Sequence, residues 1–151
     1  MLHLALWEPE IPPNTGNVAR LCAATGTRLH LVGRCGFRLD DRSLKRAGLD
    51  YWEAVDLQIH GTFTAFEAVV GVDHIVGIET NAERPYTRAA FRDGDCILFG
   101  NETRGLPDGV RERYAHRTFF IPMPTGKVRS INLATAAGIV LYEALRQLHG
   151  W

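Results

Sequence analysis

The stretch Phe99-Gly100-Asn101-Glu102-Thr103-Arg104-Gly105-Leu106-Pro107 separates two different local patterns. Residues 95–99 form a short apolar run that predicts a buried strand, and Pro107-Asp108 is typical of a helix start. Because glycine tolerates positive φ and close backbone approach, Gly100 and Gly105 predict a tight loop that holds one carboxylate and one guanidinium. Such a loop at the carboxyl end of a strand is where open α/β sheets bind ligands. The alternative interpretation is a tight turn with a surface ion pair.

Strand and helix patterns alternate along the rest of the chain. Strands are predicted at residues 2–7, 28–32, 74–79, 95–99 and 117–121, with a short third strand around Tyr51, Trp52 and Val55. Helices are predicted from a cap at Asn14 or Thr15 to about Thr25, at 40–47, at 62–70, at 107–114, and at the end of the chain, where Ile131, Ala134, Gly138, Leu141, Leu145 and Leu148 recur at helical spacing. This order indicates an α/β fold with a mostly parallel sheet, and 151 residues suit a single domain over residues 1–151.

The small residues of the last helix leave two interpretations open. Ala134, Ala136, Ala137 and Gly138 allow another element to approach closely. That element is either a second chain or the sheet of the same chain.

Charge and composition exclude several classes of protein. Lys plus Arg and Asp plus Glu both number 17, so any nucleic-acid footprint must be local rather than a property of the whole chain. The densest basic cluster is Arg38, Arg42, Lys45 and Arg46, which is either a solvated face or a phosphate-binding patch. The sequence shows no signal-peptide pattern and no apolar run long enough for a membrane helix, so we expect a cytoplasmic protein with no membrane association.

Metal and disulfide sites are not expected. Cys22, Cys35 and Cys96 are odd in number, far apart and outside any C-x-x-C pattern, which suits a reducing compartment. Six histidines show no ligand-like clustering, and we expect most of them at strand edges or on the surface: His3, His30, His60, His74, His116 and His149.

The first helix carries two stripes with different chemistry. Val18, Leu21, Cys22 and Thr25 form one stripe that should face the core. Asn17, Arg20 and Ala24 form a second stripe at three- and four-residue spacing. Asn17 and Arg20 therefore lie side by side near the start of a helix that follows a strand, as a functional pair or as a solvated polar face.

The usual catalytic templates are absent from the sequence. There is no G-x-G-x-x-G, no P-loop, no H-E-x-x-H and no G-x-S-x-G elbow. The candidates that remain lie in loops at predicted strand ends: Asn17, Arg20, Glu102, Arg104, Ser130 and Asn132.

Three ordered segments carry a family resemblance over essentially the whole chain. They are residues 14–20 (NTGNVAR), residues 99–107 (FGNETRGLP), and residues 121–123 (IPM) followed by 129–133 (RSINL). Together they resemble the three motifs of SPOUT-class RNA 2′-O-ribose methyltransferases. The segments 8–14 (EPEIPPN) and 46–51 (RAGLDY) narrow the resemblance to the tRNA wobble-nucleotide 2′-O-methyltransferases of that class.

The resemblance implies an α/β fold with helices on both faces of the sheet and a carboxyl-terminal deep trefoil knot. It also implies a homodimer that uses S-adenosylmethionine, without metal, to methylate the ribose 2′-hydroxyl of the wobble cytidine or modified uridine in the tRNA anticodon stem-loop, with leucine tRNAs as expected substrates. The alternatives are a related SPOUT methyltransferase acting on ribosomal RNA or another tRNA position, a catalytically silent RNA-binding protein on the same fold, and an unrelated nucleotide-binding regulator.

The resemblance also assigns site residues. Cofactor contacts are expected from Ile78, Gly100, Ile121, Met123 and Ser130, and catalytic or positioning roles from Arg20, Asn17, Glu102, Arg104 and Asn132. Proposals for this family make the arginine at the position of Arg20 the base that takes the proton of the reacting hydroxyl. That conflicts with the rule that arginine stays protonated in proteins, so a second role is open for Arg20: holding the phosphate and orienting the hydroxyl while another group or water takes the proton. Glu102 is expected to orient Arg20 or Arg104.

Overall fold

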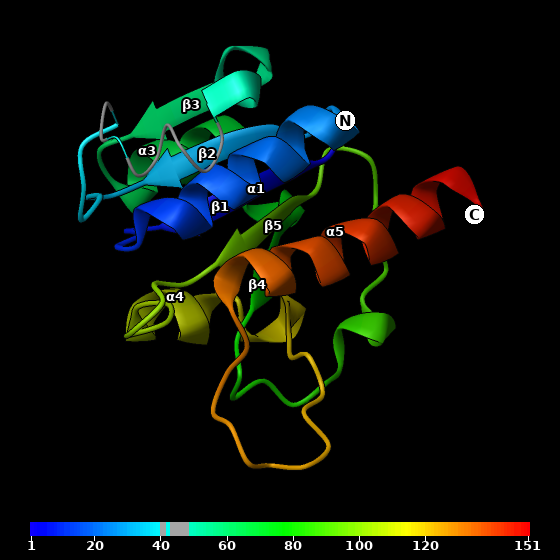
Figure 1. The fold of residues 1–151 in the computed structure, drawn as a ribbon. Helices are drawn as coiled ribbons and strands as arrows, with labels where there is room; N and C mark the ends of the chain where they lie inside the picture. The colour runs from blue at the N-terminus through cyan, green and yellow to red at the C-terminus, as the bar shows by residue number, and fades with distance from the viewer. Residues whose placement is uncertain (40–41, 43–48) are drawn as a thin grey trace.

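A parallel sheet forms the centre of the computed structural model, which describes residues 1–39, 42 and 49–151 (Figure 1). Within these residues the sheet has six strands in the order β3-β2-β1-β5-β4-β6, and every neighbouring pair is parallel. The strands are β1 (His3–Trp7), β2 (Arg28–Val32), β3 (Leu57–His60), β4 (Ile75–Ile78), β5 (Cys96–Phe99) and β6 (Thr118–Phe119). The predicted α/β class and parallel sheet are confirmed.

Helices cover both faces of this sheet. The longer ones, α1 (Pro12–Thr25) and α5 (Leu133–His149), lie in front of it in Figure 1, and α3 (Phe63–Val70) lies behind. A short helix, α4 (Asp108–Arg113), packs on the same side as α3. Four 3₁₀ segments complete the described elements: η1 (Leu49–Ala54), η2 (Val72–His74), η3 (Tyr86–Arg88) and η4 (Ala115–Arg117). No described helix is long and apolar enough to cross a membrane.

Side chains along each strand point alternately to the two faces of the sheet, and each face has its own hydrophobic core. Leu4, Leu29 and Ile97 point to the side of α1 and α5, where they join Val18 and Leu141. The residues between them point to the side of α3 and α4, and their cluster comprises Ala5, Val32, Phe66, Ile75, Cys96, Leu98, Leu106 and Tyr114. Because a parallel sheet is buried on both faces, its strands are apolar throughout rather than alternating.

The start of α1 differs from the prediction. The helix begins at Pro12, its N-cap is Ile11 without a side-chain cap bond, and Asn14 and Thr15 are buried in the first turn. The two prolines explain the earlier start, because their fixed φ is compatible with the first helical positions and they need no hydrogen-bond acceptor there. Gly26 ends the helix with φ of 69°, as expected.

The stripes of α1 are largely as predicted. Val18 and Cys22 are fully buried, whereas Leu21 is only partly buried. Asn17 and Arg20 are exposed.

The third strand lies further along the chain than predicted. The aromatic segment expected to form it belongs to η1, and the strand itself is Leu57–His60. Trp52 and Val55 pack from outside against the α1 side of the core, so their apolar character serves a covering segment rather than a strand.

Four further strands are shorter than predicted. β1 and β5 begin one residue later, β4 loses one residue at each end because η2 includes His74, and β6 spans only Thr118–Phe119. The helix predicted at 40–47 lies outside the described residues, except for Arg42. Lys45 and Arg46 of the basic cluster are therefore not placed, whereas Arg38 and Arg42 are exposed.

Three histidines form a hydrogen-bonded row across strands β1, β2 and β3, which the sequence did not indicate. His3 Nδ1 lies 2.8 Å from His30 Nε2, and His30 Nδ1 lies 2.9 Å from His60 Nε2. The rings stack at 5.1 and 5.2 Å between centroids, and the edge of Phe66 meets both His30 and His60. Neighbouring histidines of the row are 27 and 30 residues apart in the sequence, so no local sequence pattern indicates it. We call it the histidine row.

The buried face of α5 is shifted from the predicted stripe. Leu141 and Leu145 are buried as expected, together with Ala137, Val140 and Ala144. Gly138 is only partly buried, and a Cβ added to it would meet no atom within 4 Å.

Candidate active site

The predicted cofactor residues lie at the end of the sheet formed by the carboxyl ends of the strands. The register places Ile78 of β4 beside Phe99 of β5 and Phe119 of β6. The segments that follow these strands begin with Glu79, Gly100 and Phe120, so they emerge next to one another at the carboxyl edge. This is the edge at which parallel α/β sheets bind ligands.

The loop after β5 is closed by its own backbone. Asn101 and Gly105 exchange two backbone hydrogen bonds of 3.1 and 2.9 Å. A Cβ on Gly100 would lie 2.3 Å from the Gly105 carbonyl carbon, so only glycine fits there. Gly105 has φ of 69°, which glycine adopts without strain. The two glycines therefore serve the tight loop that their spacing predicts.

Glu102 joins this loop to the segment that precedes α1. Its carboxylate accepts hydrogen bonds from the backbone N–H of Glu10 at 2.9 Å and of Ile11 at 3.2 Å. This carboxylate lies at the amino end of α1, which has no side-chain cap of its own, and negative charge is stabilising there. The guanidinium of Arg104 lies 3.6 Å from Glu10 and 3.9 Å from Glu8, and 66% of its side chain is exposed.

Asn132 joins α5 to α1. Its Oδ1 accepts from the N–H groups of Ala134 and Thr135 and so caps α5, while its Nδ2 donates to Asn14 Oδ1 at 2.9 Å. Asn14 is 7% exposed and one helical turn from Asn17. The sequence predicts Asn14 only as a possible cap, and its link to Asn132 spans 118 residues. Nothing local in the sequence indicates that contact.

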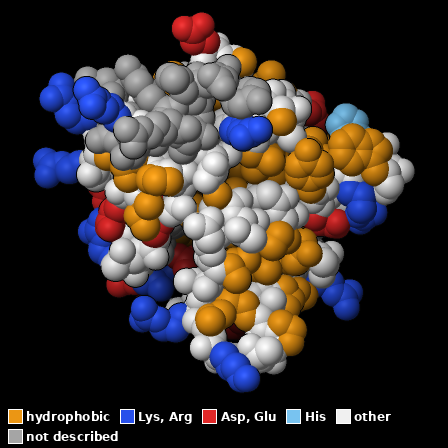
Figure 2. Space-filling view, viewed as in Figure 1, with side chains coloured by type: hydrophobic (Ala, Val, Ile, Leu, Met, Phe, Trp, Pro, Cys, Tyr) orange, Lys and Arg blue, Asp and Glu red, His pale blue; other side chains and the backbone are white. Residues whose placement is uncertain are grey.

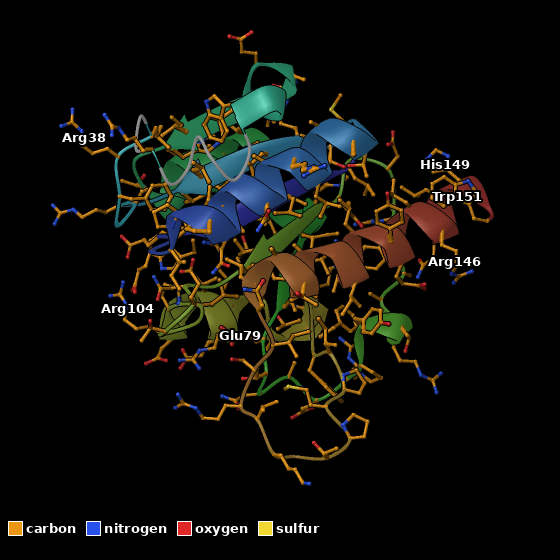
Figure 3. The ribbon with its side chains drawn as sticks, viewed as in Figure 1. Arg38, Glu79, Arg104, Arg146, His149 and Trp151 are labelled. Atoms are coloured by element: carbon orange, nitrogen blue, oxygen red, sulfur yellow. The ribbon has the colours of Figure 1, made fainter. Side chains whose placement is uncertain are left out.

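Arg20 and Asn17 are exposed on α1, whose N-cap residue Ile11 is contacted by Glu102 and whose first turn is contacted by Asn132. The structure thus joins all three motif segments, which are far apart in the chain, at the start of α1. In Figure 3, Arg104 projects outward from the side of the molecule where β1, β2 and β5 end, and Arg38 projects from the same side. Both can meet a polyanion without burying their charge.

The expected cofactor residues suit a planar, uncharged base. Ile78 is 8% exposed, and Ile121 and Met123 are partly exposed at the start of the loop before α5. Within the described part of the chain, the backbone N–H and C=O groups of Ile121 and Ser130 make no hydrogen bond. Polar backbone groups without partners beside apolar side chains are what an adenine edge and face require.

Glu79 is a site residue that the sequence does not single out. It follows Ile78, and its carboxylate accepts a hydrogen bond from the backbone N–H of Leu106, at the far end of the loop after β5. Burial raises the pKa of this carboxyl. It also lines a cavity of about 230 Å³ with Arg84, Arg111 and Thr118.

Among the described residues, no group of three or more His, Cys, Asp or Glu side chains is arranged to hold a metal ion. The histidine row is not such a group, because its ring nitrogens face one another at hydrogen-bond distance.

Known proteins resemble this chain over its full length. It is 46% identical over 149 residues to the tRNA (cytidine(34)-2'-O)-methyltransferase of Methylovorus glucosotrophus, a match that covers 97% of this chain and 96% of the relative. A solved structure described as structural insights into the 2-OH methylation of C/U34 on tRNA superposes with a TM-score of 0.93 at 50% identity, covering 100% of this chain and 98% of that one.

A more distant structure contains the cofactor. The AdoMet-bound rRNA methyltransferase from Sinorhizobium meliloti superposes with a TM-score of 0.86 at 27% identity, covering 97% of this chain and 56% of that one. The model of the SpoU rRNA Methylase family matches residues 1–142. This match covers nearly the whole chain, and the three motif segments are joined at the carboxyl end of the sheet. The protein therefore belongs to the SpoU rRNA Methylase family.

Proposed function

We propose that this protein transfers a methyl group from S-adenosylmethionine to the ribose 2′-hydroxyl of the wobble nucleotide, cytidine or modified uridine, at position 34 of tRNA. One observation carries the proposal: the contacts of Glu102 and Asn132 bring the RNA-side helix α1 against the loops expected to hold the cofactor. The full-length relatives named for this reaction support the substrate. Leucine tRNAs are the expected substrates, and the cytoplasm is the expected location.

The cofactor fits the loops after β4, β5 and β6. When bound, S-adenosylmethionine supplies a methyl group that its sulfonium has already activated. Ile78, Ile121 and Met123 would contact the adenine, and the free backbone groups of Ile121 and Ser130 would read its edge. Gly100 keeps the loop after β5 narrow.

The RNA side of the site belongs to α1 and the loop after β5. The ribose 2′-oxygen gains a carbon bond and must lose its proton in the same reaction. Arg20 remains a cation, so its role is to bind the phosphate next to the ribose and to orient the hydroxyl, while water or another group takes the proton. Asn17 lies beside it on the exposed face of α1, and Arg104 offers a second exposed cation.

The carboxyl-terminal part is proposed to be tied in a deep trefoil knot. From β6 at one edge of the sheet, the chain passes through residues 120–132 and returns as α5, which packs against α1 and β5. This long return past the ends of β4 and β5 is the path that the proposed knot requires.

A homodimer is proposed through the exposed side of α5. Figure 2 shows apolar side chains gathered over α5 and the loop before it. Tyr142 and Trp151 are 49% and 65% exposed, and Gly138 leaves open space between them and Ala134. A second copy would cover this surface. Sedimentation should therefore give twice the 16.8 kDa of one chain at micromolar concentration, and a monomer would reject the dimer.

The direct test is methylation of purified tRNA. Protein, radiolabelled S-adenosylmethionine and leucine tRNA should yield one methyl group per tRNA, which alkaline hydrolysis and mass spectrometry place on the ribose of nucleotide 34. A matched tRNA with a 2′-deoxyribose at position 34 should accept none. Methylation elsewhere in tRNA, or only of ribosomal RNA, would replace this proposal with the related-methyltransferase alternative.

A further inference from the structure

The amide of Asn101 connects two loops that are 93 residues apart in the chain. Its side chain is buried, with 4% of the residue exposed. Oδ1 accepts from the backbone N–H of Thr103 at 2.9 Å and of Arg104 at 3.1 Å, so it holds its own loop closed. Nδ2 donates to the backbone carbonyl of Glu8, just past β1. Of these hydrogen bonds, only the one from Nδ2 to Glu8 connects the Asn101 side chain to a residue outside its own loop.

Glu8 is an unusual residue to hold in this way. Its φ is 43°, and it is the one non-glycine residue with positive φ in the described part of the chain. Residues with a side chain occupy this region only when surrounding contacts enforce it. The N–H of Glu8 donates to Val32 at 2.8 Å, and its carboxylate accepts from the N–H of Arg34 at 2.9 Å. Contacts from β2 therefore hold Glu8 on one side, and Asn101 holds it on the other.

The residues that follow Glu8 lead directly into α1. Glu102 holds the next two N–H groups, of Glu10 and Ile11, and α1 then presents Asn17 and Arg20. Asn101 and Glu102 are therefore two adjacent anchors on one segment. Together they set the position of the RNA-side helix relative to the loop after β5.

We propose that Asn101 is a positioning residue for methyl transfer, acting through its single donor bond to the strained Glu8 carbonyl. The proposal rests on the proposed function, because it assigns α1 to the RNA and the loop after β5 to the cofactor. Asn101 acts through the segment and α1, not by touching either substrate. Small displacements of reacting groups reduce rates steeply, so the loss should fall on turnover.

Asn101→Asp tests the donor bond alone. Aspartate can still accept from Thr103 and Arg104, but when ionised it has no proton to donate to Glu8. At pH 8 we expect turnover at saturating tRNA and cofactor to fall by roughly 10-fold or more. The dissociation constant for S-adenosylmethionine, measured by calorimetry, should change by less than about 3-fold.

Low pH should rescue this variant. A protonated aspartic acid can donate to the Glu8 carbonyl. The carboxylates of Glu8, Glu10 and Glu102 favour its protonation, whereas the Arg104 guanidinium and the N–H groups of Thr103 and Arg104 oppose it, so the pH is lowered well below 8 to populate the acid. The turnover of Asn101→Asp relative to wild type should therefore rise as pH falls from 8 to 5.5. Asn101→Ala, which can never donate, should show no such rise. Equal pH profiles for the two variants would overturn the proposal.

Two further measurements separate this proposal from the proposed function. Hydrogen exchange over residues 8–16, without any substrate, should be faster in Asn101→Asp than in wild type. It should be unchanged in Thr64→Asp, a charge control at an exposed position in the first turn of α3 that should also keep its turnover within 2-fold. Unchanged exchange in Asn101→Asp, or a loss of cofactor affinity as large as the loss of turnover, would overturn the positioning role. Failure of the wild type to methylate tRNA would reject the proposed function, and the exchange experiment would still decide whether Asn101 holds the segment.

Discussion

The two faces of the sheet are stabilised by different kinds of contact. On the side of α1 and α5, a large cluster of mostly aliphatic side chains forms the core. The described polar contacts there include Asn14 with Asn132 and the amide of Gln147 with the backbone of Ala89 and Phe91. On the side of α3 and α4, polar groups are buried within the layer. They comprise the histidine row, the Glu67 carboxylate between Arg113 and Tyr114, and the fully buried Asp95 held by Arg117.

This difference assigns separate tasks to the two faces. Apolar packing is insensitive to direction, so the α1 side can carry exposed functional groups at little cost to stability. Buried polar groups require complete partners, so the α3 side should be sensitive to single deletions and to pH. Substitutions on the α1 side should therefore reduce turnover, and substitutions on the α3 side should reduce the free energy of unfolding.

Removal of Asp95 should give the largest effect, and it should act on stability alone. Its carboxylate accepts from Arg117 at 2.8 Å and from the N–H of Arg92 at 2.8 Å, with His74 at 3.1 Å. Asp95→Ala removes this shared acceptor, leaving the Arg117 guanidinium with only its bond to the Asp73 carbonyl, and should lower the free energy of unfolding by about 3 kcal/mol in urea titration. Turnover per folded molecule should stay within 2-fold. A catalytic defect without destabilisation would contradict the division between faces.

Arg20→Ala should give the next largest effect, and it should act on turnover alone. The side chain is exposed and lies away from the buried stripe of α1, so stability should change little. Single-turnover methylation should fall by roughly 10²-fold or more, with cofactor affinity nearly unchanged. Arg20→Lys should also fail, because it lacks the planar fork. Lost cofactor affinity would instead place Arg20 beside the methionine part of the cofactor.

Acid should weaken the α3 side through His30. Burial, followed by the proximity of His3 and His60, lowers the pKa of His30 to about 3 from an ordinary value of 6.5. His30 therefore binds a proton more readily in the unfolded chain than in the folded protein. Its contribution to the free energy of unfolding is constant above about pH 6.5 and falls by up to about 1.4 kcal/mol per pH unit as the pH drops toward 3. Arg28 opposes protonation of His30 and Asp56 favours it, and both face the row.

The measurement for His30 is the difference between wild type and His30→Asn in urea titrations from pH 7.5 to 4.5. Stability of the wild type should fall more steeply than that of the variant below pH 6.5. Parallel curves would show that His30 does not control this slope, and turnover per folded molecule should be the same at pH 7.5 in both proteins.

The two side-chain caps found among the described helices offer the finest comparison. Thr62 caps α3 by accepting from Ala65, and Asn132 caps α5 by accepting from Ala134 and Thr135. Thr62→Ala and Asn132→Ala should each cost about 1 kcal/mol in thermal unfolding. Only Asn132→Ala should also reduce turnover, because it alone loses the bond to Asn14. Equal turnover in the two variants would show that the link between α5 and α1 has no catalytic role.

Local patterns predicted much of this architecture. The sequence alone places β2, α3 and the loop after β5 correctly, because apolar runs, an amphipathic pattern and paired glycines act over a few residues. The carboxyl-edge position of the motif residues follows from the same reasoning. The third strand is misplaced by the sequence because η1 has strand-like composition, whereas it forms a 3₁₀ segment whose Trp52 packs against the core on the α1 side.

The missed features all depend on distant partners. Asn14 meets Asn132 across 118 residues, Glu79 meets Leu106 across 27, and the histidine row joins three strands. Each side chain is ordinary in its own segment. Its role follows only from strand order and register, which periodicity does not specify.

The order of the strands also has a consequence during synthesis on the ribosome. β1 is made first but lies in the middle of the sheet, and its partner β5 follows it by about 90 residues. At roughly 5–20 residues per second, β1 waits about 5–20 s for that partner, with one hydrogen-bonding edge open. β2 can pair with β1, and β3 with β2, before β5 is made, so an incomplete sheet of these three strands is expected on the nascent chain. The contacts of Asn101 and Glu102 with the Glu8–Ile11 segment form only after translation has passed both ends. The active site is thus among the last parts of the protein to assemble.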